Sequence, residues 1–225
     1  MNFEGYDKLF KREWIPPPMN LIIFDYDGVI VDSFEIFMEN FILACQKEGV
    51  DEIANKEDFL KLFEGNMYES MIKKGMSREK ILRVVYAMRD SMIKNQDRLK
   101  LFDGISEAIK ELSVSNKLAV VTSNETAIVK KFLKDRNIDY FEEIIGSDKE
   151  ASKVKKIKWL KEEFSSYECY YIGDTVGDII EGRRAGAKTV AVAWGWHSES
   201  KLREASPDYV VHSPKELADV FSRRY

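Results

Sequence analysis

The sequence predicts an α/β protein in which a doubly wound, Rossmann-like parallel sheet carries an inserted, all-helical cap domain. Beyond residue 102, short apolar runs of strand length alternate with segments whose apolar residues recur every three or four positions. This alternation is typical of a parallel sheet with right-handed crossovers and helices on both faces. Residues 34–99 show almost only the helical period, and they interrupt the chain soon after its first strand-like run. We therefore predict one α/β core with a helical insertion.

The first predicted strand is the apolar run at residues 21–24. Three consecutive prolines at 16–18 stop regular structure before it, so residues 1–18 are interpreted as an N-terminal extension. Within the insertion, apolar side chains recur at helical spacing, as at Phe34, Phe37 and Phe41. The later elements are predicted as helices at 105–112, 125–136, 154–163, 178–185 and from Pro214, and as strands at 117–121, 143–145, 168–172, 188–192 and 209–211.

These elements divide the chain into an extension, a core and a cap. The core comprises residues 19–33 and 100–225, and the cap comprises residues 34–99. Open α/β sheets bind ligands beyond the carboxyl ends of their strands. Because the insertion leaves the core just after the first strand, we expect it to lie over that crevice, and we expect the chemistry at the same strand ends.

Composition excludes several classes of protein. Of 225 residues, 35 are Lys or Arg, 39 are Asp or Glu, and 44% are hydrophobic, which is ordinary for a globular chain. The net charge of −4, without an extended basic stripe, argues against nucleic acid as the main partner. The two cysteines, Cys45 and Cys169, form no recognisable disulfide or zinc motif. No apolar run is long enough for a membrane span, so we expect a protein that does not bind membranes. We further expect it to be cytoplasmic and to be a monomer or a homodimer.

An acidic segment follows the first predicted strand. Asp25 and Asp27 are two positions apart, so in an extended chain both side chains face one pocket, while Gly28 allows a tight turn. A bare pair of this kind is more often a solvated turn, but the apolar strand in front of it favours a functional site.

A second acidic pair follows the strand at 168–172. Asp174 would lie at the strand tip and Asp178 at the start of the next helix, where the helix dipole alone also favours a carboxylate. Carboxylates that converge in one pocket repel each other unless a cation neutralises them. Because no His or Cys cluster offers a site for a softer metal, Mg²⁺ is the expected ion. The acidic residues expected around it are Asp25, Asp27, Asp174 and Asp178.

Candidate phosphate ligands lie at two further strand ends. After the strand at 117–121, Thr122 and Ser123 precede a helix, so a hydroxyl and backbone N–H groups can bind a phosphate oxygen. Asn124 is explained more simply as the N-cap of that helix, although it is also a candidate phosphate ligand.

Lys153 is the candidate cation, because it lies near a strand end where it would pair with a carboxylate and with phosphate charge. Lys155, Lys156 and Lys158 are interpreted as a solvated basic helix face, and Lys149 is a rival to Lys153.

Together these segments resemble the haloacid dehalogenase superfamily of phosphohydrolases. Four motifs match in order, namely Asp-x-Asp-Gly-x-x-x-Asp-Ser at 25–33, an apolar run ending in Thr-Ser at 120–123, Lys153, and Gly-Asp-x-x-x-Asp at 173–178. The match covers about residues 20–215, and it is most similar to phosphoglycolate phosphatase-like members with a small helical cap. Two departures are the unmatched residues 1–18 and the absence of the Lys-Pro pair that is common near the lysine in relatives.

The resemblance implies a mechanism with an aspartyl-phosphate intermediate. Asp25 would attack phosphorus, and Asp27 would protonate the leaving group and then activate water. Mg²⁺ would be held by the Asp25 carboxylate, the Asp27 backbone carbonyl and Asp174, with Asp178 bound directly or through water. The phosphate contacts would come from Thr122, Ser123, Asn124, Lys153 and Gly28.

The expected function is Mg²⁺-dependent hydrolysis of a small phosphorylated metabolite similar to phosphoglycolate. A sugar-phosphate mutase, a pyrophosphatase or a nucleotidase would use the same residues. A phosphometabolite-binding regulatory module would be expected to have a broken motif, and no motif is broken. Residues 64–66 with Lys73, Lys74 and Arg78 are candidate cap contacts to the leaving group, whereas Trp194 and Trp196 are expected in the core.

Overall fold

The computed structural model describes residues 20–222, except the side chains at 91, 92 and 222, so the predicted extension at 1–18 lies outside the described residues. Its centre is a six-stranded sheet in the order β5-β4-β1-β6-β7-β8, in which all neighbours are parallel. The strands are β1 (Asn20–Phe24), β4 (Lys117–Val121), β5 (Glu143–Ile145), β6 (Glu168–Gly173), β7 (Lys188–Val192) and β8 (Tyr209–Val211).

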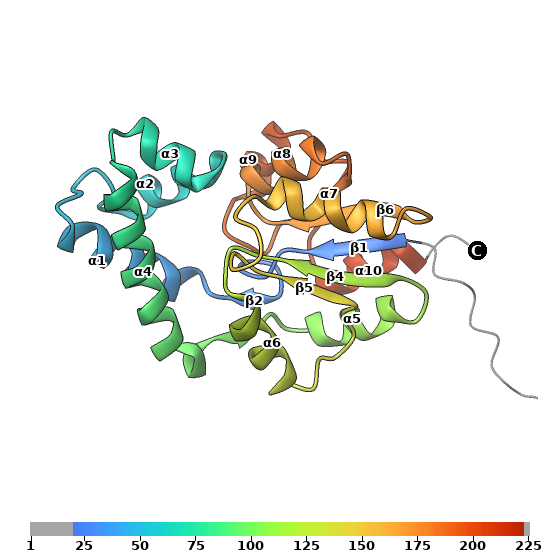
Figure 1. Ribbon diagram of the computed structural model, residues 1–225. Helices are drawn as coiled ribbons and strands as arrows, with labels where there is room; N and C mark the ends of the chain where they lie inside the picture. Colours follow the sequence, from blue (N-terminus) through green and yellow to red (C-terminus); the bar gives the residue numbers. More distant parts are fainter. Residues whose placement is uncertain (1–19, 223–225) are drawn as a thin grey trace, which may run out of the picture.

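Helices cover both faces of this sheet, which confirms the predicted doubly wound α/β class (Figure 1). The strands are apolar throughout because both faces are buried. Leu21 and Ile23 of β1 pack in the layer beneath α7, whereas Ile22 and Phe24 pack in the opposite layer. The helices of one layer are α5 (Ile105–Ser113), α6 (Thr126–Lys134) and α10 (Pro214–Ser222), and those of the other are α7 (Lys153–Glu163) and α8 (Val176–Arg184).

The strand order reverses beside β1. The chain passes from β1 to β4 and β5 on one side of the sheet, then crosses to β6, β7 and β8 on the other. The carboxyl ends of β1, β4 and β6 therefore meet at the point where an open α/β sheet forms its ligand crevice.

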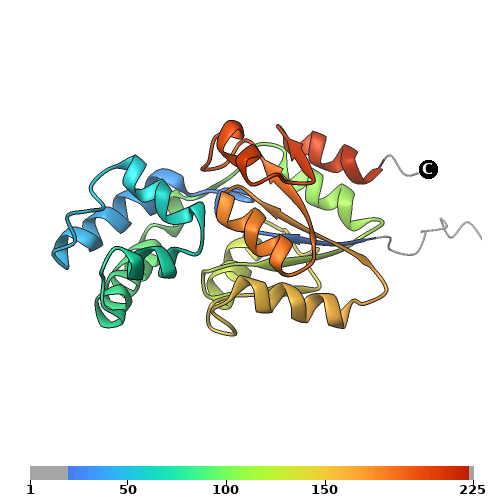
Figure 2. The same cartoon turned by 90° about the horizontal axis from the view of Figure 1, so that it is seen from above.

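A separate group of helices lies beyond these strand ends, toward which the arrow of β1 points (Figure 1; Figure 2 gives the view from above). It consists of α1 (Phe34–Lys47), α2 (Lys56–Lys61), a 3₁₀ turn (Leu62–Glu64), α3 (Met67–Lys73) and α4 (Arg78–Lys94). The α1 helix packs against α4 and buries Phe37, Phe41 and Cys45 on one stripe. None of the helices among residues 20–222 is both long and apolar enough to cross a membrane.

Two short strands join the helical group to the sheet. β2 (Val31–Asp32) and β3 (Lys100–Leu101) pair antiparallel, with Val31 opposite Leu101. These strands, and the short helix α9 (Glu199–Glu204), are absent from the sequence prediction, because two residues cannot show a strand period and six give a weak helical one.

Candidate active site

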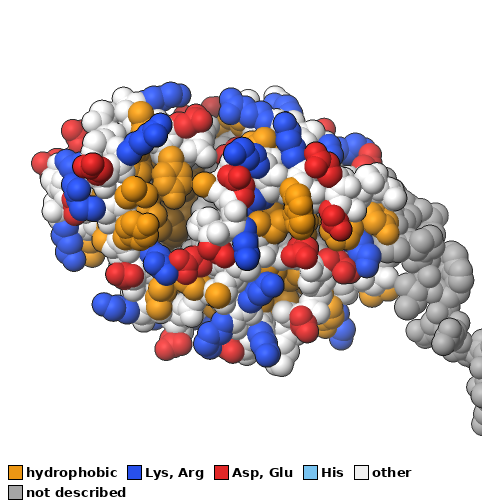
Figure 3. All heavy atoms as spheres, viewed as in Figure 1, with side chains coloured by type: hydrophobic (Ala, Val, Ile, Leu, Met, Phe, Trp, Pro, Cys, Tyr) orange, Lys and Arg blue, Asp and Glu red, His pale blue; other side chains and the backbone are white. Residues whose placement is uncertain are grey.

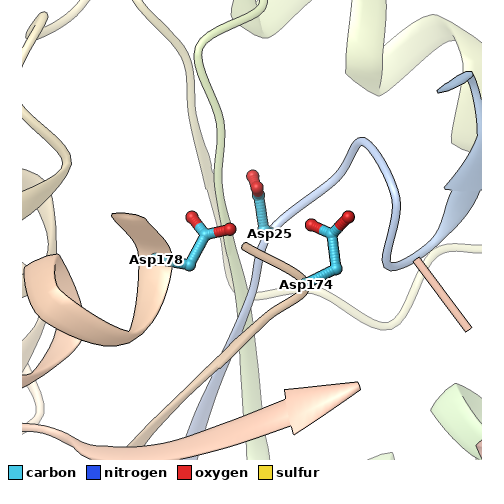
Figure 4. A group of neighbouring side chains, drawn as sticks. All are labelled: Asp25, Asp174 and Asp178. Atoms are coloured by element: carbon cyan, nitrogen blue, oxygen red, sulfur yellow. The ribbon is translucent and has the colours of Figure 1, made fainter. Parts of the chain in front are cut away.

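Three aspartates from different elements converge at the carboxyl ends of β1 and β6. Asp25 follows β1, Asp174 follows β6, and Asp178 lies in the first turn of α8. Each offers a carboxylate oxygen, and these oxygens lie within 4.8 Å of one another; Figure 4 shows the three side chains pointing toward a common centre. Their residues are only 6%, 1% and 2% exposed. The distant sequence motifs thus form one buried acidic site.

Lys153, the first residue of α7, joins two of these carboxylates. Its Nζ donates to Asp25 Oδ2 at 2.8 Å and to Asp178 Oδ1 at 2.6 Å. Although burial opposes charge on the amine, Asp178 and Asp25 raise the pKa of Lys153 well above its usual value. Lys149 is exposed and lines a different surface hollow together with Trp159. Of the two rival lysines, the structure brings Lys153 to the aspartates.

The acidic site carries more negative charge than Lys153 can neutralise. Burial raises the pKa of Asp25 to about 7 against the opposing charge of Lys153, and burial raises the pKa of Asp27 to about 6. The pKa of Asp174 lies well above its usual value because of burial and the nearby charge of Asp178. Such an all-oxygen donor set with excess negative charge fits a hard divalent cation such as Mg²⁺.

Asp178 also closes the N-terminus of α8. Its Oδ2 accepts hydrogen bonds from the Thr175 backbone N–H at 3.1 Å and from the Thr175 hydroxyl at 2.6 Å, while its own N–H donates to that hydroxyl. Despite burial, Lys153 and these hydrogen bonds hold the pKa of Asp178 below its usual value. The helix therefore begins at Val176, two residues before the predicted start, and Asp178 serves both the cap and the acidic site.

The Asp27 carboxylate lies outside the group of three aspartates. Its Oδ2 accepts a hydrogen bond from Asn124 Nδ2 at 2.5 Å, and its Oδ1 is buried without a hydrogen-bond partner among residues 20–222. The predicted role of Asn124 as helix N-cap is wrong, because α6 begins at Thr126 and Glu125 occupies the cap position. The side-chain amide of Asn124, which does not cap the helix, instead binds the carboxylate of Asp27.

Gly28 makes the turn after the acidic segment. Its φ of +74° is in the left-handed region, and a Cβ there would lie 1.9 Å from Asp174 Oδ2. Its N–H donates to the Val31 carbonyl at 2.9 Å, so this group belongs to the turn rather than to an open phosphate site. Only glycine allows Asp174 to approach so closely.

In the Thr-Ser segment after β4, Ser123 lines the cavity above the three aspartates, and Thr122 does not. The Thr122 side chain is fully buried, and its Oγ1 accepts from the Asn124 N–H at 3.0 Å, whereas Ser123 is exposed at the entrance. The Thr122 carbonyl accepts from Lys156 Nζ at 2.6 Å. Lys156 is only 1% exposed, so its assignment to the solvated face is wrong. Its position three residues after Lys153 places both lysines on one side of α7, a periodicity already present in the sequence.

Two connected cavities lie over the aspartates. The carboxylate pocket, of about 50 Å³, is lined by Asp25, Asp174 and Lys153, among others. It shares Lys153 with a passage of about 80 Å³, to which Gly65 and Asn66 of the helical group contribute. Of the predicted cap contacts, Gly65 and Asn66 therefore reach the site. Lys73, Lys74 and Arg78 are exposed and do not line either cavity.

The helical group is bound directly to the loop that carries Asp174. His197 Nδ1 accepts a hydrogen bond from the Val176 N–H at 3.0 Å, so its Nε2 carries the proton and donates to the Leu60 carbonyl at 3.1 Å. Asn66 Nδ2 donates to Glu181 Oε1 at 3.1 Å. Sequence reasoning missed these contacts, because only the folded chain brings α8 against the helical group.

The chain is similar to haloacid dehalogenase-like hydrolases over most of its length, since the model of that family matches residues 22–192. It is 26% identical over 204 residues to pyrophosphatase PpaX from Listeria innocua, an alignment that covers 87% of this chain and 93% of the relative. It is also 26% identical over 203 residues to a phosphoglycolate phosphatase from Synechococcus elongatus, covering 88% and 95% of the two chains.

Solved structures show the same architecture. A haloacid dehalogenase-like hydrolase from Streptococcus pneumoniae superposes with a TM-score of 0.73 at 26% identity, covering 90% of this chain and 98% of that one. A protein described as a predicted phosphatase from Clostridium acetobutylicum gives a TM-score of 0.75 at 23% identity, with the same coverage, and at that identity the likeness concerns the fold.

Proposed function

We propose that this chain, which belongs to the haloacid dehalogenase-like hydrolase family and is a phosphatase, hydrolyses a small phosphorylated metabolite through an aspartyl-phosphate with Mg²⁺ as cofactor. The family and the enzyme class that the motifs predict are confirmed. The observation that carries the proposal is the ion-paired Asp25, buried beside Asp174 and Asp178 at the strand ends.

Asp25 is the nucleophile in this proposal. Lys153 holds one of its oxygens and favours the ionised form against the effect of burial. A bond forms between the Asp25 carboxylate and phosphorus as the bond from phosphorus to the leaving oxygen breaks. Because an acyl phosphate is more reactive than the original ester, this splits one difficult displacement into two easier ones.

Asp27 transfers the proton in both steps. It protonates the leaving oxygen first, and it then takes a proton from the water that attacks the aspartyl-phosphate and releases Asp25. A pKa of about 6, which burial produces, suits a carboxyl that must both give and accept a proton near neutral pH. The Asn124 amide keeps this carboxyl turned away from the group of three aspartates.

Asp25 and Asp174 would hold Mg²⁺ through their carboxylates, together with the Asp27 carbonyl. Asp178, which lies in the same group of three aspartates, would contact the ion directly or through water. When bound, the ion shields the negative charge of the nucleophile from that of the phosphate. Thr122, Ser123 and Lys153 would hold the phosphate oxygens.

The helical segment at 34–99 would act as a cap, because its Gly65 and Asn66 line the passage above the carboxylate pocket. We also place the enzyme in the cytoplasm. The support is that Cys45 and Cys169 are free, buried thiols, the state that a reducing compartment maintains.

The test is phosphate release from a panel of phosphorylated metabolites with Mg²⁺ and with a chelator. Asp25→Asn is expected to lower kcat by several orders of magnitude, because it removes the nucleophile. Asp103→Asn, a substitution at an exposed position away from the site, should leave the rate unchanged. Normal turnover by Asp25→Asn, or full activity with the chelator, would contradict the proposal.

A further inference from the structure

A larger cavity continues from the passage toward the outside. This outer cavity, of about 290 Å³, shares Tyr68, Val85 and Met88 of the helical group with the passage, and it also shares Asn124. On the core side it reaches Ile128 of α6. Figure 3 shows hydrophobic side chains gathered around a hollow between the helical group and the core. A phosphate held at the carboxylate pocket would therefore direct its leaving group into this cavity.

The charges in the outer cavity disfavour an anionic leaving group. Among the described residues that line it, Arg89 is the single cation, and it is ion-paired with Glu125 at 2.7 Å. Asp148 adds a second carboxylate to the lining. A leaving carboxylate or phosphate would meet two acidic groups and no unpaired cation, so its burial there would be unfavourable.

The remaining surface is suited to an uncharged ring. Tyr68 and Tyr86 contribute aromatic side chains, and Tyr86 and Leu82 are 56% and 48% exposed at the cavity although both are large and hydrophobic. Aromatic side chains bind planar rings by stacking. An exposed apolar surface beside a catalytic site is typical of a ligand-binding groove.

Two buried donors in the lining have no hydrogen-bond partner in the part of the chain that the structure describes. Tyr26 is only 2% exposed, and its hydroxyl is buried without a hydrogen-bond partner. The same holds for Nε of Arg89, whose terminal nitrogen binds Glu125. Because buried polar groups are nearly always paired in native proteins, these donors indicate a ligand that offers acceptor atoms, a role that hydroxyl or carbonyl oxygens can fill.

The volume also indicates a leaving group larger than glycolate. About 290 Å³ is close to the roughly 300 Å³ at which small-molecule pockets begin. Glycolate is charged and would occupy a small part of this space. A nucleoside has a planar ring, neutral hydroxyl and carbonyl acceptors, and no charge.

We infer that the substrate is the phosphate monoester of an uncharged, ring-bearing alcohol of the nucleoside type. The outer cavity between α4 and α6 receives the alcohol part of this substrate. This inference rests on the proposed phosphatase function and deepens it. It favours the nucleotidase among the alternatives that the motifs leave open.

The first test compares kcat/KM for uridine 5′-monophosphate, phosphoglycolate and pyrophosphate, with acetyl phosphate as a probe of the chemistry alone. Uridine 5′-monophosphate is expected to exceed both anionic substrates at least tenfold. If acetyl phosphate is hydrolysed in a way that depends on Asp25 but phosphoglycolate or pyrophosphate is preferred, this inference fails and the proposed function stands. If nothing is hydrolysed, the proposed function fails as well.

Two variants test the cavity itself. Glu125→Gln releases Arg89 for an anionic leaving group, so the ratio of kcat/KM for phosphoglycolate to that for uridine 5′-monophosphate should rise roughly tenfold. Glu142→Gln removes a comparable surface ion pair, with Lys117, and should not change that ratio. An unchanged ratio in Glu125→Gln would contradict the proposal that the ion pair of Glu125 with Arg89 disfavours an anionic leaving group.

Tyr86→Ala tests the aromatic wall. It should lower kcat/KM for uridine 5′-monophosphate roughly fivefold and leave acetyl phosphate unaffected, because it removes one stacking contact. Trp159→Ala is the matched control, since Trp159 is a similarly exposed aromatic residue, 47% accessible, outside the outer cavity. Equal effects of Tyr86→Ala on both substrates would overturn the proposed place of the ring.

Discussion

At the scale of single residues, we expect Lys156 to position the site, because its amine is buried whereas those of Lys155 and Lys158 are on exposed residues. Its buried amine donates to the Thr122 carbonyl and thereby fixes the end of β4, where the proposed phosphate ligands begin. Burial lowers the pKa of this amine to about 8, aided by the nearby charge of Lys153. The hydrogen bond therefore stabilises a charged group that the surrounding core disfavours.

Lys156→Met keeps the length of the side chain and removes the donor, so we expect the Thr122 segment to shift. A displacement of about 1 Å in a catalytic group lowers the rate roughly 100-fold, and the effect should appear in kcat more than in KM. Steady-state kinetics of Lys156→Met and of the exposed Lys158→Met measure it. Equal kcat values for the two variants would show that Lys156 does not position the site.

The sequence predicts single residues well where their place depends only on a strand end. Asp25 and Asp174 follow apolar strands, so parallel pairing alone brings them to one edge. Asn124 and Lys156 were misassigned because their partners, Asp27 and the Thr122 carbonyl, lie 97 and 34 residues away. Helix boundaries and solvation depend on such contacts, and a local pattern does not contain them.

At the scale of elements, the helical group contacts the first turn of α8 beside the site. A Cβ on Gly177 would lie 2.5 Å from the Gly65 carbonyl, so only glycine lets the first turn of α8 approach the helical group so closely. Trp196 packs against Phe37, Phe59 and Phe63, with its ring centroid 4.9–5.5 Å from theirs. This tryptophan is buried as predicted, but it is buried between the two parts of the molecule.

His197 joins the same two parts by hydrogen bonds. His197→Phe keeps a ring and leaves the Val176 N–H and the Leu60 carbonyl unpaired, which costs about 1–3 kcal/mol for each buried group. For a chain of this size, each kcal/mol lowers Tm by roughly 2–4 °C. Thermal unfolding of His197→Phe should therefore show a clearly lower Tm, and the variant should also have a higher KM.

Two further variants separate the hydrogen bonds from the ring. His197→Asn retains one acceptor and one donor, so its Tm should be higher and its KM lower than those of His197→Phe. His212→Phe is the control, because His212 is exposed and its ring is hydrogen-bonded to the surface residues Glu199 and Glu216. If His197→Phe behaves like His212→Phe, the contact does not hold the two parts together.

Strands were predictable to the residue where a buried apolar run has clear borders, as in β4, β5, β7 and β8. The paired linkers β2 and β3 were not predicted, since Val31 and Leu101 pair across the whole helical insertion and are far apart in the sequence. Short elements that depend on distant partners carry little local signal.

At the scale of the whole molecule, the reversal of strand order beside β1 concentrates acidic groups in one buried place. The alternating strands and helices already predict this arrangement. The outer cavity could not be predicted, because its walls come from helices of both parts of the chain and depend on how these parts pack.

This concentration of charge makes the stability of the metal-free protein depend on pH. Three aspartates have pKa values above the usual aspartate pKa of 3.8, which applies to the unfolded chain. The pKa is about 7 for Asp25 and about 6 for Asp27, and it is raised for Asp174. Between roughly pH 4 and pH 7 the folded state thus binds more protons than the unfolded state, so the free energy of unfolding falls as pH rises. Asp178, whose pKa is lowered, opposes this trend in part, below about pH 4.

Because Mg²⁺ competes with these protons, its effect should have the opposite pH dependence. We expect added Mg²⁺ to raise Tm at pH 8 and to have little effect at pH 5, since each displaced proton weakens binding up to about tenfold per pH unit. Asp174→Asn removes one repelling charge, so its metal-free form should be more stable than the wild type at pH 8, yet respond less to Mg²⁺. A Tm increase that is equal at both pH values, or an undiminished response in Asp174→Asn, would show that the ion binds elsewhere.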